Sequence, residues 1–305
     1  MATARSNAGG EAVVAPRNAA VIAVAQMTSV GDTDANFATC QRLAEEAAAK
    51  GASMLCLPEN FSFVGSHFTQ SLAVAEPLDG PLMGRYQDLA ARTGLWLSLG
   101  GFQESGPDPD HVYNAHVIVS DKGKIAAVYR KIHLFDVDIP DGPTLLESRF
   151  TAPGACMACC EAPAGRLGLS TCYDLRFPEL YQRLVYDHGA TILLMPSCFT
   201  VPTGEAHWEV LLRSRAIETQ SYVIAAAQAG EHNEKRRSYG HSLVIDPWGR
   251  VVAKLADPQA TGIALATIDM EELRSIRERM PVQMHRATGR SVLTSDAFQD
   301  CHAPP

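Results

Sequence analysis

Short apolar runs and segments of helical periodicity alternate along the chain from residue 19 onward. Residues 19–27, AAVIAVAQM, are almost all apolar and predict a buried strand. Residues 36–51 repeat apolar side chains at helical spacing and end at a glycine, which predicts a helix. Alternation of this kind is typical of an α/β protein. Further strands are predicted over 53–59, 95–104, 167–174, 191–199 and 221–230, and further helices over 81–94, 178–189 and 207–220.

Two predicted hairpins in different halves of the chain resemble each other. Tyr113 and Gly123 are ten residues apart, as are Tyr239 and Gly249. Each glycine is followed by a basic residue and an apolar strand. This internal repeat favours one domain of two similar halves, with mixed sheets that are covered by helices.

We expect this single domain to span residues 19–290. Residues 1–18 are rich in Ala, Gly and Asn and predict a disordered leader, and residues 291–305 predict a loose tail. The leader has no apolar stretch like that of a secretory signal, and its two arginines and one glutamate make a poor mitochondrial presequence. We therefore expect a cytoplasmic protein, with mitochondrial import as the alternative.

The composition argues against two classes of partner. The chain has 305 residues, of which 46% are hydrophobic and 20% charged, as in a globular protein with a sizeable core. Its net charge of −8 argues against nucleic acid, because a phosphate binder needs a positive surface. No apolar run approaches the ~18 residues that span a bilayer, so no membrane partner is expected.

The cysteines predict free thiols rather than a metal centre. The chain has eight cysteines and no secretory signal, which indicates a reducing compartment. Cys156 and Cys159 form a C-x-x-C, but neither a second C-x-x-C nor a histidine pair follows at zinc-finger spacing. We interpret residues 156–160 as a loop with incidental cysteines. We expect no metal and, without a Gly-rich phosphate loop, no cofactor.

Three polar or reactive residues, Glu59, Lys131 and Cys172, stand at the ends of predicted strands, where open α/β sheets collect active sites. Cys172 marks the change from the strand-like run RLGLSTC to the helix-like run PELYQRLVYDHG. A nucleophile at such an elbow is held out from the sheet beside amides that can form an oxyanion hole. Each residue alone also fits a structural role, as a buried thiol, a solvated carboxylate or a surface lysine. A Cys–His pair with His133 or His207 is the alternative, and the spacing favours neither histidine.

The motifs around these residues resemble those of the nitrilase superfamily of carbon-nitrogen hydrolases, in its Nit branch. They occur in the family's order and cover residues 19–288. Within the branch, LWLSLGGFQE and ESRFTAPG are most similar to the members that cleave deaminated glutathione, and less similar to omega-amidases. The other motifs are LPENF around Glu59, YRKIHLFD around Lys131, STCYDLRFPELY around Cys172, GEAHWEVLLRSRAIETQ, YGHSLVIDPWG and MPVQMHRAT.

The resemblance implies a four-layer αββα sandwich and a Glu–Lys–Cys triad. In such a triad Glu59 is the general base, and the Cys172 thiol attacks the amide carbonyl to form a thioester. Lys131, with the backbone N–H of Tyr173, stabilises the oxyanion. As a neighbouring cation, Lys131 is also expected to lower the pKa of the thiol. A second family glutamate matches Glu147, which would orient Lys131 or the substrate. The alternative for Glu147 is a surface carboxylate.

The implied reaction is hydrolysis of the amide bond of deaminated glutathione to 2-oxoglutarate and cysteinylglycine. The alternatives are an omega-amidase acting on 2-oxoglutaramate, a true nitrilase, a catalytically silent scaffold of the same fold, and a thiol redox protein. The intact Glu59, Lys131 and Cys172 argue against the silent scaffold. The resemblance also implies a homodimer or a higher homo-oligomer, through the helix that starts at Pro178 and the helix over 207–220.

An acidic protein that binds a small carboxylate-bearing amide needs a local positive site. The planar guanidinium of Arg176 suits a carboxylate, although an ion pair with Asp174 or Glu179 would equally brace the elbow. The loop EHNEKRRSYG offers two arginines that we expect to reach the glycine end of the substrate. The remaining candidate substrate-binding residues are Tyr173, Phe199, Thr200, Thr203, Arg236 and Arg237.

Overall fold

The long strand β1 (Ala19–Met27) lies inside a stack of layers. Ala23, Ala25 and Met27 pack against helices in one hydrophobic cluster, and Ile22 and Val24 pack in a second cluster between two sheets. Neighbouring side chains of a strand point to opposite faces, so both faces of this sheet are covered. The structure, a computed structural model, describes residues 19–138 and 144–286. The predicted leader, 1–18, and the predicted tail, 291–305, lie outside the described residues.

The described residues form two large sheets. The first has the order β13-β12-β1-β2-β3-β4-β5, with β16 paired to β1, and the second has the order β15-β14-β11-β10-β9-β8. In the first sheet, β1, β2 and β3 are parallel and β4 and β5 are antiparallel to their neighbours. In the second sheet, β9, β10 and β11 are parallel and β14 and β15 are antiparallel. The two halves therefore repeat one mixed topology, as the two hairpins predict.

The strands have the following bounds. Those of the first sheet are β2 (Met54–Leu57), β3 (Trp96–Ser105), β4 (Val112–Val119), β5 (Ile125–Arg130), β12 (Ala227–Asn233), β13 (Arg236–Tyr239) and β16 (Gly262–Asp269). Those of the second are β8 (Cys159–Ala162), β9 (Gly165–Leu169), β10 (Ile192–Leu194), β11 (Tyr222–Ala225), β14 (Leu243–Ile245) and β15 (Val251–Lys254). A separate pair consists of β6 (Asp136–Asp138) and β7 (Thr144–Leu146).

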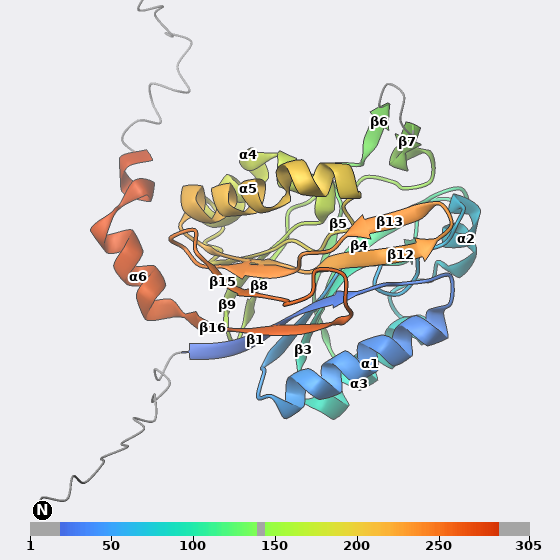
Figure 1. Cartoon of the computed structure of the whole chain (residues 1–305), viewed down its shortest axis with the longest axis horizontal. Helices are drawn as coiled ribbons and strands as arrows, with labels where there is room; N and C mark the ends of the chain where they lie inside the picture. Colours follow the sequence, from blue (N-terminus) through green and yellow to red (C-terminus); the bar gives the residue numbers. More distant parts are fainter. Residues whose placement is uncertain (1–18, 139–143, 287–305) are drawn as a thin grey trace, which may run out of the picture.

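Helices cover the outer face of each sheet (Figure 1), and the expected four-layer αββα sandwich is confirmed. Helices α1 (Thr33–Ala49) and α3 (Pro81–Thr93) lie on the first sheet, and α4 (Pro178–Tyr186) and α5 (Val201–Thr219) lie on the second. Helix α1 starts three residues before its predicted segment, because the side chain of Asp32 accepts from the first-turn amides of Asp34 and Ala35. The remaining helical elements are α2 (Phe68–Val74), α6 (Met270–Arg279) and the 3₁₀ turns η1 (Glu147–Arg149) and η2 (Cys172–Arg176).

Two segments differ from their predicted form. Residues 221–230 do not form one strand, because the chain leaves the second sheet after β11 and enters the first sheet as β12, with Ala226 between them. Residues 156–160 are not wholly a loop, because Cys159 and Cys160 begin β8 and pair with β9. The partner of β12 is β1, which is distant in sequence, and β8 is a short, half-buried strand, so local periodicity revealed neither.

Gly100 in β3 provides a test of the packing between the sheets. A Cβ on Gly100 would lie 2.0 Å from Cβ of Pro196 and 2.6 Å from the carbonyl oxygen of Leu57. We expect Gly100→Ala to lower the free energy of unfolding by about 1–3 kcal/mol through overpacking. Gly84→Ala in helix α3 is the matched control, because nothing lies within 4 Å of its Cβ position, and it should raise stability by about 0.5–1 kcal/mol. Urea unfolding of both variants measures this. Equal stability of Gly100→Ala and wild type would contradict it.

Candidate active site

Cys172 stands at a strained elbow between β9 and α4. It begins the 3₁₀ turn η2, and its φ is +50°, a left-handed value that is unfavourable for a residue with a Cβ. Its amide donates to the carbonyl of Pro196 at 2.9 Å, which ties the elbow to the chain beyond β10. The strand-to-helix elbow predicted at this cysteine is therefore present.

Asp174, two residues further on, anchors the elbow. This fully buried carboxylate accepts from the Tyr129 hydroxyl at 2.6 Å, from His133 Nδ1 at 2.7 Å and from the Thr171 amide at 2.9 Å. Tyr129 belongs to the first sheet, so these hydrogen bonds connect the two sheets. They fix the position of Cys172 between the sheets. His133 is engaged here, with its ring stacked on Phe177.

The thiol of Cys172 faces a carboxylate instead of a histidine. It hydrogen-bonds with the side chain of Glu59, and its sulfur accepts from the backbone N–H of Cys198. His207, the other histidine candidate, lies on α5 with Nδ1 3.3 Å from Nη2 of Arg176. The arrangement is therefore that of a Cys–Glu pair.

Lys131 lies between two glutamates in this cluster. Its Nζ is 3.1 Å from Oε1 of Glu59 and 2.8 Å from Oε2 of Glu147. The side chains are 2%, 5% and 14% exposed for Lys131, Glu59 and Glu147, so Glu147 is not a solvated surface carboxylate. The amide of Phe135 also donates to Oε2 of Glu147 at 2.7 Å, which orients this carboxylate toward Lys131.

Two polar residues that the sequence interpretation missed complete the cluster. Nδ2 of Asn114 donates to Glu59 at 2.9 Å and to Glu147 at 3.3 Å, so it bridges the two carboxylates. Nε2 of Gln228, on β12, donates to the backbone carbonyl of Glu59 at 3.0 Å. The sequence does carry a signal for both residues: each is a polar amide inside a mostly apolar run. A buried amide is uncommon without a hydrogen-bond partner.

The charges of the cluster set its resting protonation. Burial alone would raise the pKa of Glu59, but the charge of Lys131 and the hydrogen bonds from Cys172 and Asn114 hold it below its ordinary value. Burial would lower the pKa of Lys131, but the two glutamates raise it well above its ordinary value. Burial and the negative charge of Glu59 raise the pKa of the Cys172 thiol well above its ordinary value. Lys131 lowers that pKa, as expected, but burial and Glu59 outweigh its effect. At rest Glu59 is therefore ionised and the Cys172 thiol holds its proton.

A small cavity of about 30 Å³ opens beside the thiol, between η2, β10 and α5. Arg176 lines it, half-buried, with its guanidinium near the rings of Tyr173 and Phe199 at 5.7 and 5.8 Å. Among the described residues Arg176 forms no ion pair with Asp174 or Glu179, so the bracing alternative is wrong. The lining residues are Phe135, Cys172, Tyr173, Arg176, Cys198, Phe199, Thr200 and Thr203.

The two arginines of β13 differ in position. Nη2 of Arg236 donates to the sulfur of Cys198 at 3.1 Å, so its guanidinium lies beside the cavity. Arg237 is exposed, pairs along the strand with Glu231 and does not line the cavity. Adjacent residues of a strand point to opposite faces, which explains the difference.

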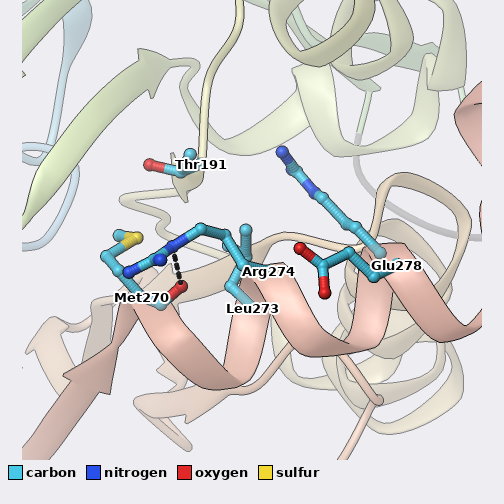
Figure 2. A pocket seen from close by; sticks show the side chains of 6 residues that line it. Thr191, Met270, Leu273, Arg274 and Glu278 are labelled. Atoms are coloured by element: carbon cyan, nitrogen blue, oxygen red, sulfur yellow. Dashed lines mark hydrogen bonds between the residues drawn. The ribbon is translucent and has the colours of Figure 1, made fainter.

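A larger cavity, of about 400 Å³, lies beside helix α6 (Figure 2). In it Arg274 donates to the Met270 carbonyl of its own helix at 3.2 Å. None of the predicted site residues lines this cavity. The lining residues are Thr191, Met270, Leu273, Arg274, Arg277 and Glu278.

Comparison with known families supports the same assignment. The profile of the family described as Carbon-nitrogen hydrolase matches residues 21–278. The chain belongs to the carbon-nitrogen hydrolase family. The resemblance seen in the motifs is thereby confirmed, and the chain is a hydrolase of carbon–nitrogen bonds other than peptide bonds.

Individual relatives match most of the chain. Deaminated glutathione amidase of Mus musculus is 49% identical over 270 residues, which are 87% of this chain and 83% of the mouse protein. The protein of the same name from Dictyostelium discoideum is 48% identical over 272 residues, which are 87% of this chain and 93% of that protein.

Solved carbon-nitrogen hydrolase structures share the fold. The C. elegans NitFhit protein superposes with a TM-score of 0.84 at 44% identity, covering 91% of this chain and 66% of that longer chain. Saccharomyces cerevisiae Nit3, a member of branch 10 of the nitrilase superfamily, gives a TM-score of 0.76 at 30% identity. The match covers 87% of this chain and 95% of Nit3. In the described part of the chain, no helix combines the length and apolar character needed to cross a bilayer.

The ion cluster of this carbon-nitrogen hydrolase predicts a pH-dependent stability. The depressed pKa of Glu59 contributes stability that is present above its ordinary value of 4.5 and is lost as the pH falls through the folded-state value. Lys131→Met leaves two buried carboxylates without their cation, so their pKa values should rise. We expect the variant to lose about 3–5 kcal/mol at neutral pH and to regain part of this as the pH falls. Urea unfolding at about pH 7 and about pH 5 measures both effects.

The double variant Lys131→Met/Glu147→Gln is the control. It removes one of the two carboxylate charges that repel each other without Lys131, so it should lose less stability than Lys131→Met. A Lys131→Met loss that does not change with pH would show that packing, rather than charge, holds the cluster together.

Proposed function

We propose that the chain is an amidase that hydrolyses deaminated glutathione to 2-oxoglutarate and cysteinylglycine. The observation that carries the proposal is the contact between the protonated Cys172 thiol and the ionised Glu59 carboxylate, with the Lys131 ammonium on the same carboxylate. The substrate follows from the relatives that bear the name deaminated glutathione amidase and match 87% of the chain.

In the first step the Cys172 sulfur attacks the amide carbonyl while its proton moves to Glu59. The carbonyl oxygen becomes an oxyanion, which the ammonium of Lys131 and the backbone N–H of Tyr173 stabilise. The C–N bond then breaks, and Glu59 returns the proton to the departing amine of cysteinylglycine. A general base within hydrogen-bond reach contributes about 10²–10⁴-fold to such a step.

The second step hydrolyses the thioester on Cys172. Glu59, now ionised again, takes a proton from water as the water oxygen attacks the thioester carbonyl. The C–S bond breaks, 2-oxoglutarate leaves, and the sulfur recovers its proton from Glu59. Glu147 and Asn114 hold Lys131 and Glu59 in position through both steps, because each contacts one or both of them.

The cavity beside Cys172 supplies the groups that an anionic acyl chain needs. Arg176 offers a guanidinium, and Thr200 and Thr203 offer hydroxyls at the start of helix α5. The N-terminal end of a helix carries partial positive charge, which favours a carboxylate there. We assign the 2-oxoglutaryl end of the substrate to this side.

The experiment incubates the purified protein separately with deaminated glutathione and 2-oxoglutaramate and follows the products by mass spectrometry. Faster release of cysteinylglycine from the first supports the proposal. A preference for the second makes the protein an omega-amidase with the same triad, and turnover of neither overturns the proposed substrate class.

Variants in the same assay test the mechanism. Cys172→Ala should lower the rate about 10⁴-fold or more, because no nucleophile remains, while circular dichroism stays native. Cys156→Ala is the matched control, since Cys156 is an exposed thiol outside the cluster, and it should keep wild-type activity. An active Cys172→Ala enzyme would rule out the thioester route.

We also propose a cytoplasmic homodimer that associates through α5. Val210 and Ile217 on this helix are 68% and 45% exposed, and Ile217 adjoins the β14–β15 turn, which carries the 56% exposed Trp248. We expect the double substitution Val210→Asp/Ile217→Asp to convert dimer to monomer in sedimentation velocity. Leu265→Asp on β16, a similar change at a 37% exposed site, is the control. A monomeric wild type would refute the dimer.

A further inference from the structure

A second thiol, Cys198, lies in the catalytic cavity and has no part in the triad chemistry. It follows β10, is 7% exposed, and its backbone N–H contacts the Cys172 sulfur. Its own sulfur accepts from Nη2 of Arg236 at 3.1 Å and lies 3.2 Å from Oγ of Ser238. A buried sulfur with a guanidinium and a hydroxyl on it is a polar site rather than simple packing.

A hydrogen-bond chain leads from this sulfur to a histidine. Oγ of Ser238 is 2.7 Å from Nε2 of His232, and Nδ1 of His232 is 2.7 Å from the carbonyl oxygen of Ser29. A carbonyl can only accept, so Nδ1 carries a proton. The single hydroxyl proton of Ser238 therefore stands between the Cys198 sulfur and Nε2. A proton can pass between these two atoms through the hydroxyl.

The sulfur is balanced between its two protonation states. Burial would raise the pKa of Cys198, but the charge of Arg236 and the hydrogen bond and charge of His232 lower it to about 7, against the opposing charge of Glu59. The thiols of Cys40 and Cys56, which lack such partners, have pKa values raised to about 12 by burial. When ionised, the Cys198 sulfur forms an ion pair with Arg236. Another anion can displace the sulfur from this guanidinium.

Arg176 and Arg236 lie at different places around the site, so each can contact a different end of the substrate. Arg176 is half-buried and lines the cavity, whereas Arg236 lies outside this lining with its guanidinium on the sulfur of Cys198, near enough for its charge to act on Glu59 and Cys172. The proposed function places the 2-oxoglutaryl end beside Arg176, Thr200 and Thr203, so the peptide arm of deaminated glutathione lies on another side of Cys172. The guanidinium of Arg236, next to this cavity on an overall exposed residue, is the cation that this arm would contact.

We propose that Arg236 binds the glycine carboxylate of the leaving group, and that the Cys198 sulfur occupies this subsite until the substrate replaces it. This rests on the proposed function. As the carboxylate binds the guanidinium, the sulfur leaves it and takes up a proton from solvent, relayed by the Ser238 hydroxyl that lies 3.2 Å from the sulfur. No covalent bond to substrate forms in this exchange. Arg236 thereby selects deaminated glutathione over 2-oxoglutaramate, which has no such carboxylate.

Steady-state kinetics of Arg236→Gln test the selection. We expect KM for deaminated glutathione to rise about ten- to hundred-fold relative to KM for 2-oxoglutaramate, as when a hydrogen bond to a charged group is lost, because any effect of the lost charge on Glu59 applies to both substrates. Arg237→Gln is the matched control and should leave KM and kcat for both substrates unchanged. An equal effect of Arg236→Gln on both substrates, or none on either, overturns the assignment.

A spectroscopic test reports on the subsite without turnover. The probe is the dipeptide alanylglycine, which has the carboxylate but no thiol, added to Cys172→Ser protein. Binding should decrease the thiolate absorbance, and this decrease should vanish in Cys172→Ser/Cys198→Ala, in Cys172→Ser/Arg236→Gln, and with alanylglycinamide. Saturable binding with unchanged absorbance overturns the exchange. Because this readout needs no hydrolysis, failure of the proposed function leaves it interpretable.

Discussion

The buried ion cluster of Lys131 with Glu59 and Glu147 is the constraint on which the rest of the site depends. An ammonium group that is 2% exposed is unfavourable unless carboxylates surround it. Here the carboxylates come from the end of β2 and from η1, and the lysine from the end of β5. Asn114 on β4 links both carboxylates, so the cluster exists only when four distant segments meet. The same contacts that stabilise the charges also set the protonation on which catalysis depends.

The sandwich brings Cys172, the proposed nucleophile, to this cluster from the opposite sheet. Glu59 and Lys131 end strands of the first sheet, and Cys172 follows β9 of the second. Asp174 holds the two together, because it accepts from Tyr129 on β5 while it caps the turn at Thr171. The left-handed φ of Cys172 is a local strain that this fully buried network maintains. Fold stability and thiol placement therefore depend on the same hydrogen bonds.

Several cations surround the cavity. Lys131 lies in the buried ion cluster, Arg176 lines the cavity, and Arg236 lies beside Cys198, where its charge acts on Glu59 and Cys172. This arrangement gives an acidic protein local cations around one site, which suits a substrate with a carboxylate on each side of its amide bond. In the proposed mechanism, Lys131 acts on the reacting carbonyl, whereas Arg236 acts on the leaving group.

The sequence by itself determined the alternation of strands and helices, the repeat of the two halves, and the approach of Glu59, Lys131 and Cys172, because these follow from periodicity and from motifs that are local in the chain. Only the tertiary structure decided the split of residues 221–230 between two sheets, the bridging role of Asn114, and the raised pKa of the Cys172 thiol. Each of these depends on burial or on a partner many residues away. Hydrogen-bond partners and desolvation are properties of the packed molecule, and no short stretch of sequence contains them.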